Sequence, residues 1–323
     1  MPVNLSRILR SSHLRVHLKE LRFNTHISTD KFGDTDLDGI ATLRRIAKAI
    51  SKHEDVSIHT IYNDGGIHSF DQIIWVFATS GIDSIRHIIA SSASNPIRSI
   101  ISDGEPGDLD QRISSMFSNL DTLKIPIYLL QHENYGVLLS QAGRNVNHLH
   151  LHWKSNTWMP PRGEEHMSPW RMCRRVISSD LLFLHDLSGP VMHSTRLQTI
   201  CISDLNVEPA VLGLLARHAE NIKELTFYRV WLVFQDTYSV RPSRRARISD
   251  GDEEVLSKDL QLERFTRWQD FIDIFQDTYK NTPKRLYVAK LFDPMELATI
   301  EVDGDINVVR LLTDEEMVAR LGI

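Results

Sequence analysis

Short apolar segments with a common spacing recur along the chain and constrain its fold more than any other feature. Each copy has apolar residues at its first, fourth and sixth positions. The clearest copies are Leu18-Leu21-Phe23, Leu120-Leu123-Ile125, Val146-Leu149-Leu151, Leu197-Ile200-Ile202 and Ile222-Leu225-Phe227, and the weaker ones are Ile97-Ile100 and Leu286-Val288. Side chains alternate along a strand, so the fourth and sixth positions face the same side. Each copy therefore predicts a short strand with one buried side and one surface side.

Segments with helical spacing separate these strands, at residues 5–14, 40–50, 113–120, 137–142, 211–219 and 268–279. Equivalent residues lie 23 positions apart from Ile100 to Leu123, 26 from Leu123 to Leu149 and 25 from Ile200 to Leu225. These distances fall in the window of roughly 20–29 residues that is typical of leucine-rich repeats. We therefore predict an irregular, leucine-rich-repeat-like α/β solenoid, with parallel strands on its concave face and helices on its convex face.

The solenoid is predicted to span residues 1–293, with insertions at 154–169 and 233–264. Residues 294–323 are expected to form a C-terminal tail or capping segment. The prediction requires Leu123, Leu149, Ile200 and Leu225 to stack as a buried ladder, because they share one place in the repeat.

Residues that alternate with the core positions are expected to face the concave side and to contact a protein partner. The predicted partner-binding residues are Arg22, Lys124, His148, His150, His152, Glu224, Tyr228 and Tyr287. They mix charges, imidazoles and aromatic rings, which is typical of a surface for a polar polypeptide rather than a deep apolar pocket. We expect Lys124, His150, His152 and Tyr228 to lie together, and we expect affinity to rise toward pH ~6 if the imidazoles act as cations.

Several segments resemble a known family. Ile8–Leu14 leading into Leu18–Phe23, Asn221–Phe227, and Trp268–Phe275 followed by Pro283–Leu286 look like the irregular repeat regions of fungal F-box proteins. The resemblance spans roughly residues 5–293. It implies a substrate receptor similar to the repeat region of F-box ubiquitin-ligase subunits. The F-box itself would precede the first repeat and is not expected in this chain, so a ubiquitin-ligase adaptor is an expected partner only if an F-box lies upstream.

The strand His148-Leu149-His150-Leu151-His152 suggests an alternative function. Its three imidazoles would share one face and could approach a transition metal, so a metal-dependent hydrolase centred on them is the alternative. Such a site also needs ligands from other strands, and no second motif supplies them. We therefore predict a polar strip on a binding surface, with no catalytic residue, no metal and no cofactor.

Asp34, Asp36 and Asp38 match the opening of a calcium-binding EF-hand loop, but Arg45 occupies the position of the closing glutamate. We expect no calcium site, and we expect Asp38 to cap a helix over 39–50. Trp153, Trp158, Trp170 and Trp231 are candidate hot spots or core covers in equal measure.

Composition excludes further classes of function. The net charge of −5 gives no broad attraction to nucleic acid or to an anionic membrane, and the basic residues of segment 241–247 are followed by an acidic run at 250–254. A nucleic-acid reader built on that basic segment is a third alternative that we do not favour. No signal peptide or apolar run of about 20 residues is present, and two cysteines suit a reducing compartment. We expect a cytoplasmic or nuclear protein without a membrane partner.

Overall fold

The chain forms two compact units, each built from parallel strands and helices. The computed structural model describes residues 3–23, 37–63, 70–90, 115–116, 119–126, 146–152, 176–177, 197–207, 209, 212, 215, 222–232, 266–293, 297–302 and 308–322. The first unit comprises Met1–Trp158 with Thr195–Leu197, and the second comprises Met159–Ser194 with Gln198–Ile323. The predicted insertions at 154–169 and 233–264 lie outside the described residues, as do Trp153, Trp158, Trp170 and the basic segment 241–247.

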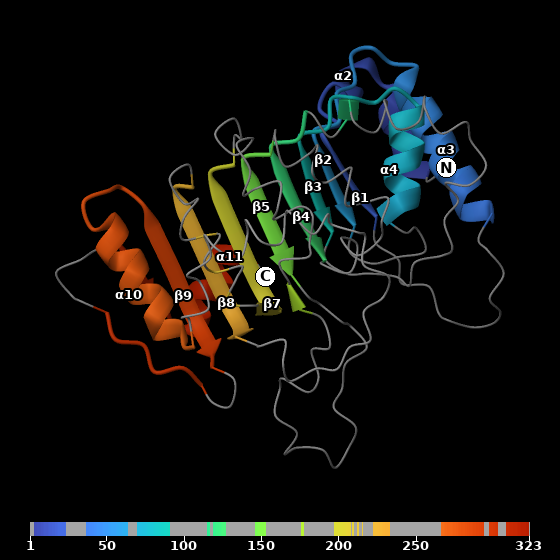
Figure 1. Ribbon diagram of the computed structural model, residues 1–323. Helices are drawn as coiled ribbons and strands as arrows, with labels where there is room; N and C mark the ends of the chain where they lie inside the picture. The colour runs from blue at the N-terminus through green and yellow to red at the C-terminus, as the bar shows by residue number, and fades with distance from the viewer. Residues whose placement is uncertain are drawn as a thin grey trace, which may run out of the picture. The chain divides into compact units, whose positions relative to one another are not determined.

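The first unit contains five neighbouring parallel strands. They are β1 (Glu20–Phe23), β2 (Thr60–Asn63), β3 (His87–Ala90), β4 (Thr122–Pro126) and β5 (His148–His152), and they lie side by side in chain order, from blue to green in Figure 1. The described helices of this unit are α1 (Val3–Arg10), α2 (Ser12–Arg15), α3 (Leu37–Ser51) and α4 (Phe70–Thr79). The prediction of an α/β fold with parallel strands is therefore confirmed.

One side of these five strands forms a row of buried apolar residues. The row runs across all five strands in register and consists of Leu21, Ile61, Ile88, Leu123 and Leu149, each at most 8% exposed. Phe77 of α4 contacts Phe23 of β1 with ring centroids 6.2 Å apart, so α4 covers this apolar side. Helix α3 buries Leu43, Ala47 and Ile50, which lie four and three residues apart on one helical face.

Two of the five strands were missed by the sequence prediction. Strands β2 and β3 follow the same spacing, with Ile58 and Ile85 fully buried at their first positions. Their sixth positions, however, are Asn63 and Ala90 rather than large apolar residues, which hid the repeat. The segment Ile97-Ile100 lies outside the described residues. Strand β4 pairs directly with β3. Helix α3 begins at Leu37, so Asp38 lies inside the helix and the prediction that it caps the helix is wrong.

The second unit contains strands β6 (Val176–Ile177), β7 (Thr199–Val207), β8 (Glu224–Leu232), β9 (Arg285–Phe292) and β10 (Val309–Leu311). Strand β6 pairs with β7, and β7, β8, β9 and β10 follow one another in parallel. Ile200 pairs with Leu225 and both are at most 3% exposed, as Leu123 and Leu149 are paired and buried in the first unit. Strand β10 lies in the segment 294–323, so this segment extends the sheet.

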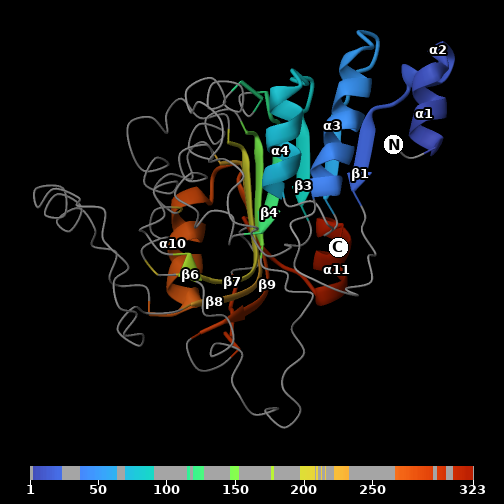
Figure 2. The same cartoon turned by 90° about the vertical axis from the view of Figure 1, so that its right-hand side faces the viewer.

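Two helices lie on opposite sides of the strands of the second unit (Figure 2). Helix α10 (Trp268–Tyr279) matches the predicted range, and its Trp268 and Phe271 contact Phe227 of β8 at 5.2 and 5.8 Å between ring centroids. Helix α11 (Asp314–Leu321) packs on the other side, where Met317 contacts Tyr228 and Ala289. The second unit therefore has three layers, with the sheet between the two helices.

Strands β7, β8 and β9 share a backbone irregularity at one level. Asp204, Arg229 and Lys290 have positive φ values of 58°, 51° and 51°. Their neighbours on both sides are paired across the strands, so the three residues lie opposite one another. Each adds one residue to the alternation, as between buried Ile202 and buried Leu205. These aligned bulges let each strand bend while its apolar residues stay on the side of α10.

Candidate protein-binding face

The polar face of the first unit is the side of its sheet opposite the buried row. Its residues form two rows in register, Glu20-Thr60-His87-Thr122-His148 and Arg22-Tyr62-Ile89-Lys124-His150. Arg22, Glu20 and His148 are exposed, and most of the others are partly exposed. The Arg22 guanidinium lies 4.6 Å from the centre of the Tyr62 ring. These rows place side chains from five separate segments on one continuous surface.

The polar face of the first unit carries an excess of positive charge. Among its ten residues, the two cations Arg22 and Lys124 stand against one carboxylate, Glu20. The whole chain carries a net charge of −5, so this face has the opposite sign to the molecule as a whole. Such a local excess attracts an anionic segment of a partner and raises the rate of encounter.

The three histidines of β5 occupy three different environments. His148 is exposed, His150 is partly exposed, and His152 is only 4% exposed. Burial, the Lys124 ammonium and His152 together hold the pKa of His150 well below its usual value of 6.5. His150 is therefore neutral at neutral pH, and its charging, with any gain in affinity for an anion, requires a lower pH than the predicted ~6.

His152 is a structural residue rather than an accessible one, which corrects the prediction for this position. Its Nε2 lies 2.7 Å from the carbonyl oxygen of Ala90 in β3. A carbonyl can only accept, so Nε2 carries the proton and donates it. This hydrogen bond orients the ring toward β3 and removes Nε2 as a metal ligand. Among the residues that the structure describes, no group of three His, Cys, Asp or Glu side chains is arranged to hold a metal ion.

The remaining predicted partner-binding residues belong to the second unit and contact helix α11. Tyr228 is 1% exposed, and its hydroxyl donates a 2.7 Å hydrogen bond to Asp314. Burial and this hydrogen bond raise the pKa of Tyr228 to about 12. Glu224 forms a 2.6 Å ion pair with Arg320, whose guanidinium lies 3.6 Å above the Tyr287 ring. The expectation that Tyr228 is accessible to a partner is therefore wrong, because α11 covers it.

Sequence reasoning missed several residues of these surfaces. Tyr62 and Ile89 lie in the two strands whose spacing was hidden, although Ile58 and Ile61 would have revealed the first of them.

Trp231, left undecided between hot spot and core cover, is partly exposed and stacks on Phe292 at 4.6 Å with an angle of 8° between the rings. Asp34 and Asp36 of the calcium-like loop lie outside the described residues.

Comparison with known proteins does not assign the chain to a family. No protein-family model matches the chain, and no curated protein matches it. Among the described helices, none combines the length and the apolar character that crossing a bilayer requires.

Proposed function

We propose that this chain is a non-catalytic protein-interaction module with a leucine-rich-repeat-like solenoid, and that the polar face of its first unit binds an acidic segment of a partner protein. The observation that carries the proposal is the pair of polar rows across β1 to β5. Their residues are in register, all except Thr60 are partly or fully exposed, and the cations Arg22 and Lys124 outnumber the carboxylate of Glu20. An extended, mixed polar surface of this kind suits a polypeptide better than a small molecule.

The resemblance to the repeat regions of fungal F-box proteins suggests the class of partner. We propose a substrate-receptor role, in which the partner is a protein presented to a ubiquitin ligase, and a cytoplasmic or nuclear location. Recruitment of the ligase adaptor would require an F-box and is not assigned to the described residues.

Charge reversal on the polar face tests the proposal. Affinity purification coupled to mass spectrometry would compare the wild-type chain with an Arg22→Glu/Lys124→Glu variant. A matched control, Arg45→Glu/Lys52→Glu, reverses two exposed charges on and just after α3. A partner retained by the wild type and the control, and then purified, should bind the face variant about tenfold or more weakly, which corresponds to ~1.4 kcal/mol.

Two results would decide against the proposal. Equal affinity of the purified partner for the face variant and the control variant would move the interface elsewhere. A partner segment with a net positive charge would contradict the proposed chemistry. Circular dichroism of both variants establishes that any loss of binding is not a loss of fold.

A further inference from the structure

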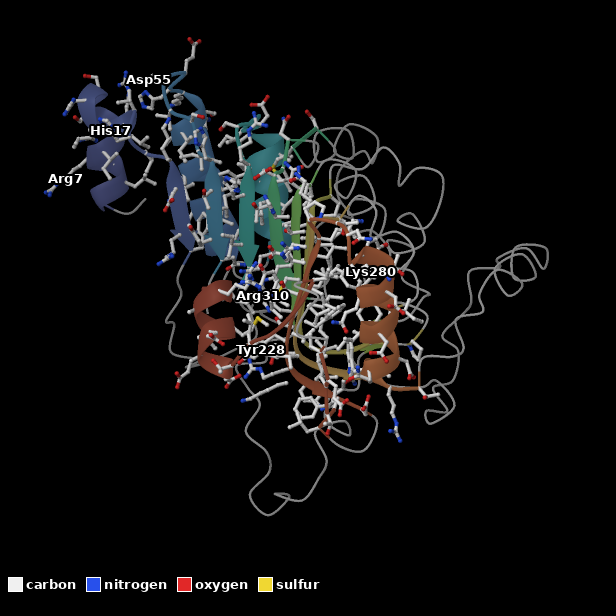
Figure 3. All side chains as sticks on the ribbon, turned by 90° about the vertical axis from the view of Figure 1, so that its left-hand side faces the viewer. Arg7, His17, Asp55, Tyr228, Lys280 and Arg310 are labelled. Atoms are coloured by element: carbon white, nitrogen blue, oxygen red, sulfur yellow. The ribbon has the colours of Figure 1, made fainter. Side chains whose placement is uncertain are left out.

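Helix α11 occupies the polar face of the second unit, which we define as Glu224, Tyr228, Tyr287, Ala289 and Lys290. Met317 is fully buried against Tyr228 and Ala289, and Leu312, Val318 and Leu321 pack around this cluster. Figure 3 shows Tyr228 on the side of the sheet that carries α11, away from Lys280 at the end of α10. The polar face of the second unit is therefore filled by a segment of the chain itself.

Polar contacts at both ends of α11 fix the orientation of the helix on this face. At the beginning of the helix, Asp314 accepts hydrogen bonds from the Tyr228 hydroxyl and the Lys290 ammonium, each at 2.7 Å. Toward its end, Arg320 pairs with Glu224 at 2.6 Å and lies over Tyr287. A helix rises ~1.5 Å per residue, so these two charges stand about 9 Å apart along its axis. The face thus matches a helix with an acidic first turn, a central apolar stripe and a later arginine.

Helix α11 is held by few buried side chains. Met317 is its only buried residue, and the ion pairs at its two ends have side chains that remain 31–47% exposed. Exposed ion pairs contribute little and are screened by salt. An isolated helix of this length is marginal in water, although Thr313 and Glu316 form a capping box and Gly322 ends the helix with φ of 62°. Elements with so little burial are the first to open in a folded protein.

We propose that the polar face of the second unit is a binding site for an amphipathic helix, and that α11 is its internal occupant, which a partner helix displaces. The partner carries the α11 pattern, namely an acidic residue, apolar residues three, four and seven positions later, and an arginine six positions later. The site involves only residues of the second unit, so it stands or falls independently of the acidic-segment site on the first unit.

A fluorescein-labelled peptide copying Thr313–Gly322 is the probe, and its anisotropy is measured against the full-length chain. Met317→Asp should release α11, because the packed helix would have to bury a carboxylate. Ala319→Pro should release it by breaking the helix at an exposed position. If the wild-type face is open ~10% of the time, the released variants should bind the peptide about tenfold more tightly than the wild type.

Charge complementarity provides the specificity control. A peptide with Asp314→Lys should lose affinity for the released chain, and adding Lys290→Glu to that chain should restore part of it. If Met317→Asp does not fold, Ala319→Pro carries the test, because its substitution lies on the solvent side. Folded released variants that bind the peptide no better than the wild type would overturn the proposal and make α11 a permanent part of the fold. A peptide with Ala319→Ser, a change at an exposed position, serves as the control. If it loses as much affinity for the released chain as the Asp314→Lys peptide does, the proposal is also overturned.

Discussion

At the scale of single residues, environment separates side chains that look equivalent in the sequence. His148, His150 and His152 alternate with two leucines on one strand, and the periodicity places all three on one face. Yet His152 is buried and donates a hydrogen bond to the carbonyl of Ala90, whereas His150 lies beside Lys124 and has a lowered pKa. The difference arises from β3 and β4, the strands on one side of β5, and therefore from residues distant in the chain.

We expect His150 to make the stability of the chain depend on pH. Because its folded pKa lies below 6.5, the unfolded chain binds the proton more readily, and the free energy of unfolding falls as pH drops below about 6.5. One such proton accounts for at most ~1.4 kcal/mol per pH unit. Urea denaturation of the wild type and His150→Gln at pH 8, 6.5 and 5.5 should show a smaller acid loss in the variant.

The measurement at pH 8 is the control, since it isolates the cost of the substitution from the cost of protonation. Equal acid losses for the wild type and His150→Gln would show that the environment of this imidazole does not penalise its charge.

At the scale of elements, the aligned bulges keep three neighbouring parallel strands in register. Because each strand carries the extra residue at the same level, pairing continues without a shift on both sides of it. Asp204, Arg229 and Lys290 are these extra residues, and Arg229 also pairs with Asp204 at 2.7 Å across the bulge. The sequence carries a signal for it, because aliphatic and phenyl side chains two positions apart give way to a gap of three, as from Phe227 to Val230.

We expect the bulge at Lys290 to reverse the usual preference for alanine over glycine. Both Lys290→Gly and Lys290→Ala remove the ion pair with Asp314, so they differ chiefly in the backbone conformation that they tolerate. At φ of 51° glycine avoids a left-handed penalty of roughly 1–2 kcal/mol, and Lys290→Gly should unfold at higher denaturant than Lys290→Ala.

The matched control is Arg310 in β10, an exposed strand residue without a positive φ. There the glycine variant should be less stable than the alanine variant, by roughly 0.5–1 kcal/mol. The same order of stability at both positions would mean that the bulge imposes no strain on its side chain.

At the scale of the whole molecule, each of the two units has its own kind of polar surface. The first unit presents basic rows with partly exposed side chains, and the second presents a face that holds α11. Both surfaces suit polypeptides, and neither brings three metal-ligating groups together among the described residues. The interaction module remains our proposal for the chain, and a hydrolase centred on β5 remains the alternative.

Zinc titration distinguishes these two functions directly. A metal site on β5 would stabilise the folded chain by about 2.7 kcal/mol at a zinc concentration 100-fold above its dissociation constant. We expect that zinc does not raise the melting temperature through these histidines. The wild type and the His148→Ala/His150→Ala variant should therefore respond to zinc in the same way. A zinc-dependent rise, lost in the double variant and retained in a His53→Ala control, would favour the hydrolase.

The sequence by itself determined the local elements of this protein, because periodicity is a property of neighbouring residues. The spacing of Leu123 with Ile125 and of Leu149 with Leu151 predicted two strands, each with one buried side. The apolar stripe of Trp268–Tyr279 predicted helix α10. Strands β2 and β3 escaped because Asn63 and Ala90 stand where the pattern expects large apolar residues.

Only the tertiary structure decided which polar positions stay accessible. Tyr228 is buried by a helix whose Asp314 lies 86 residues further along the chain, and His152 is held by a carbonyl 62 residues before it. No local pattern encodes which segment will cover a sheet face, since that depends on the free energy of contacts between distant segments. The strand on which Tyr228 and Glu224 lie was predictable, but their contact with Met317 and Arg320 was not.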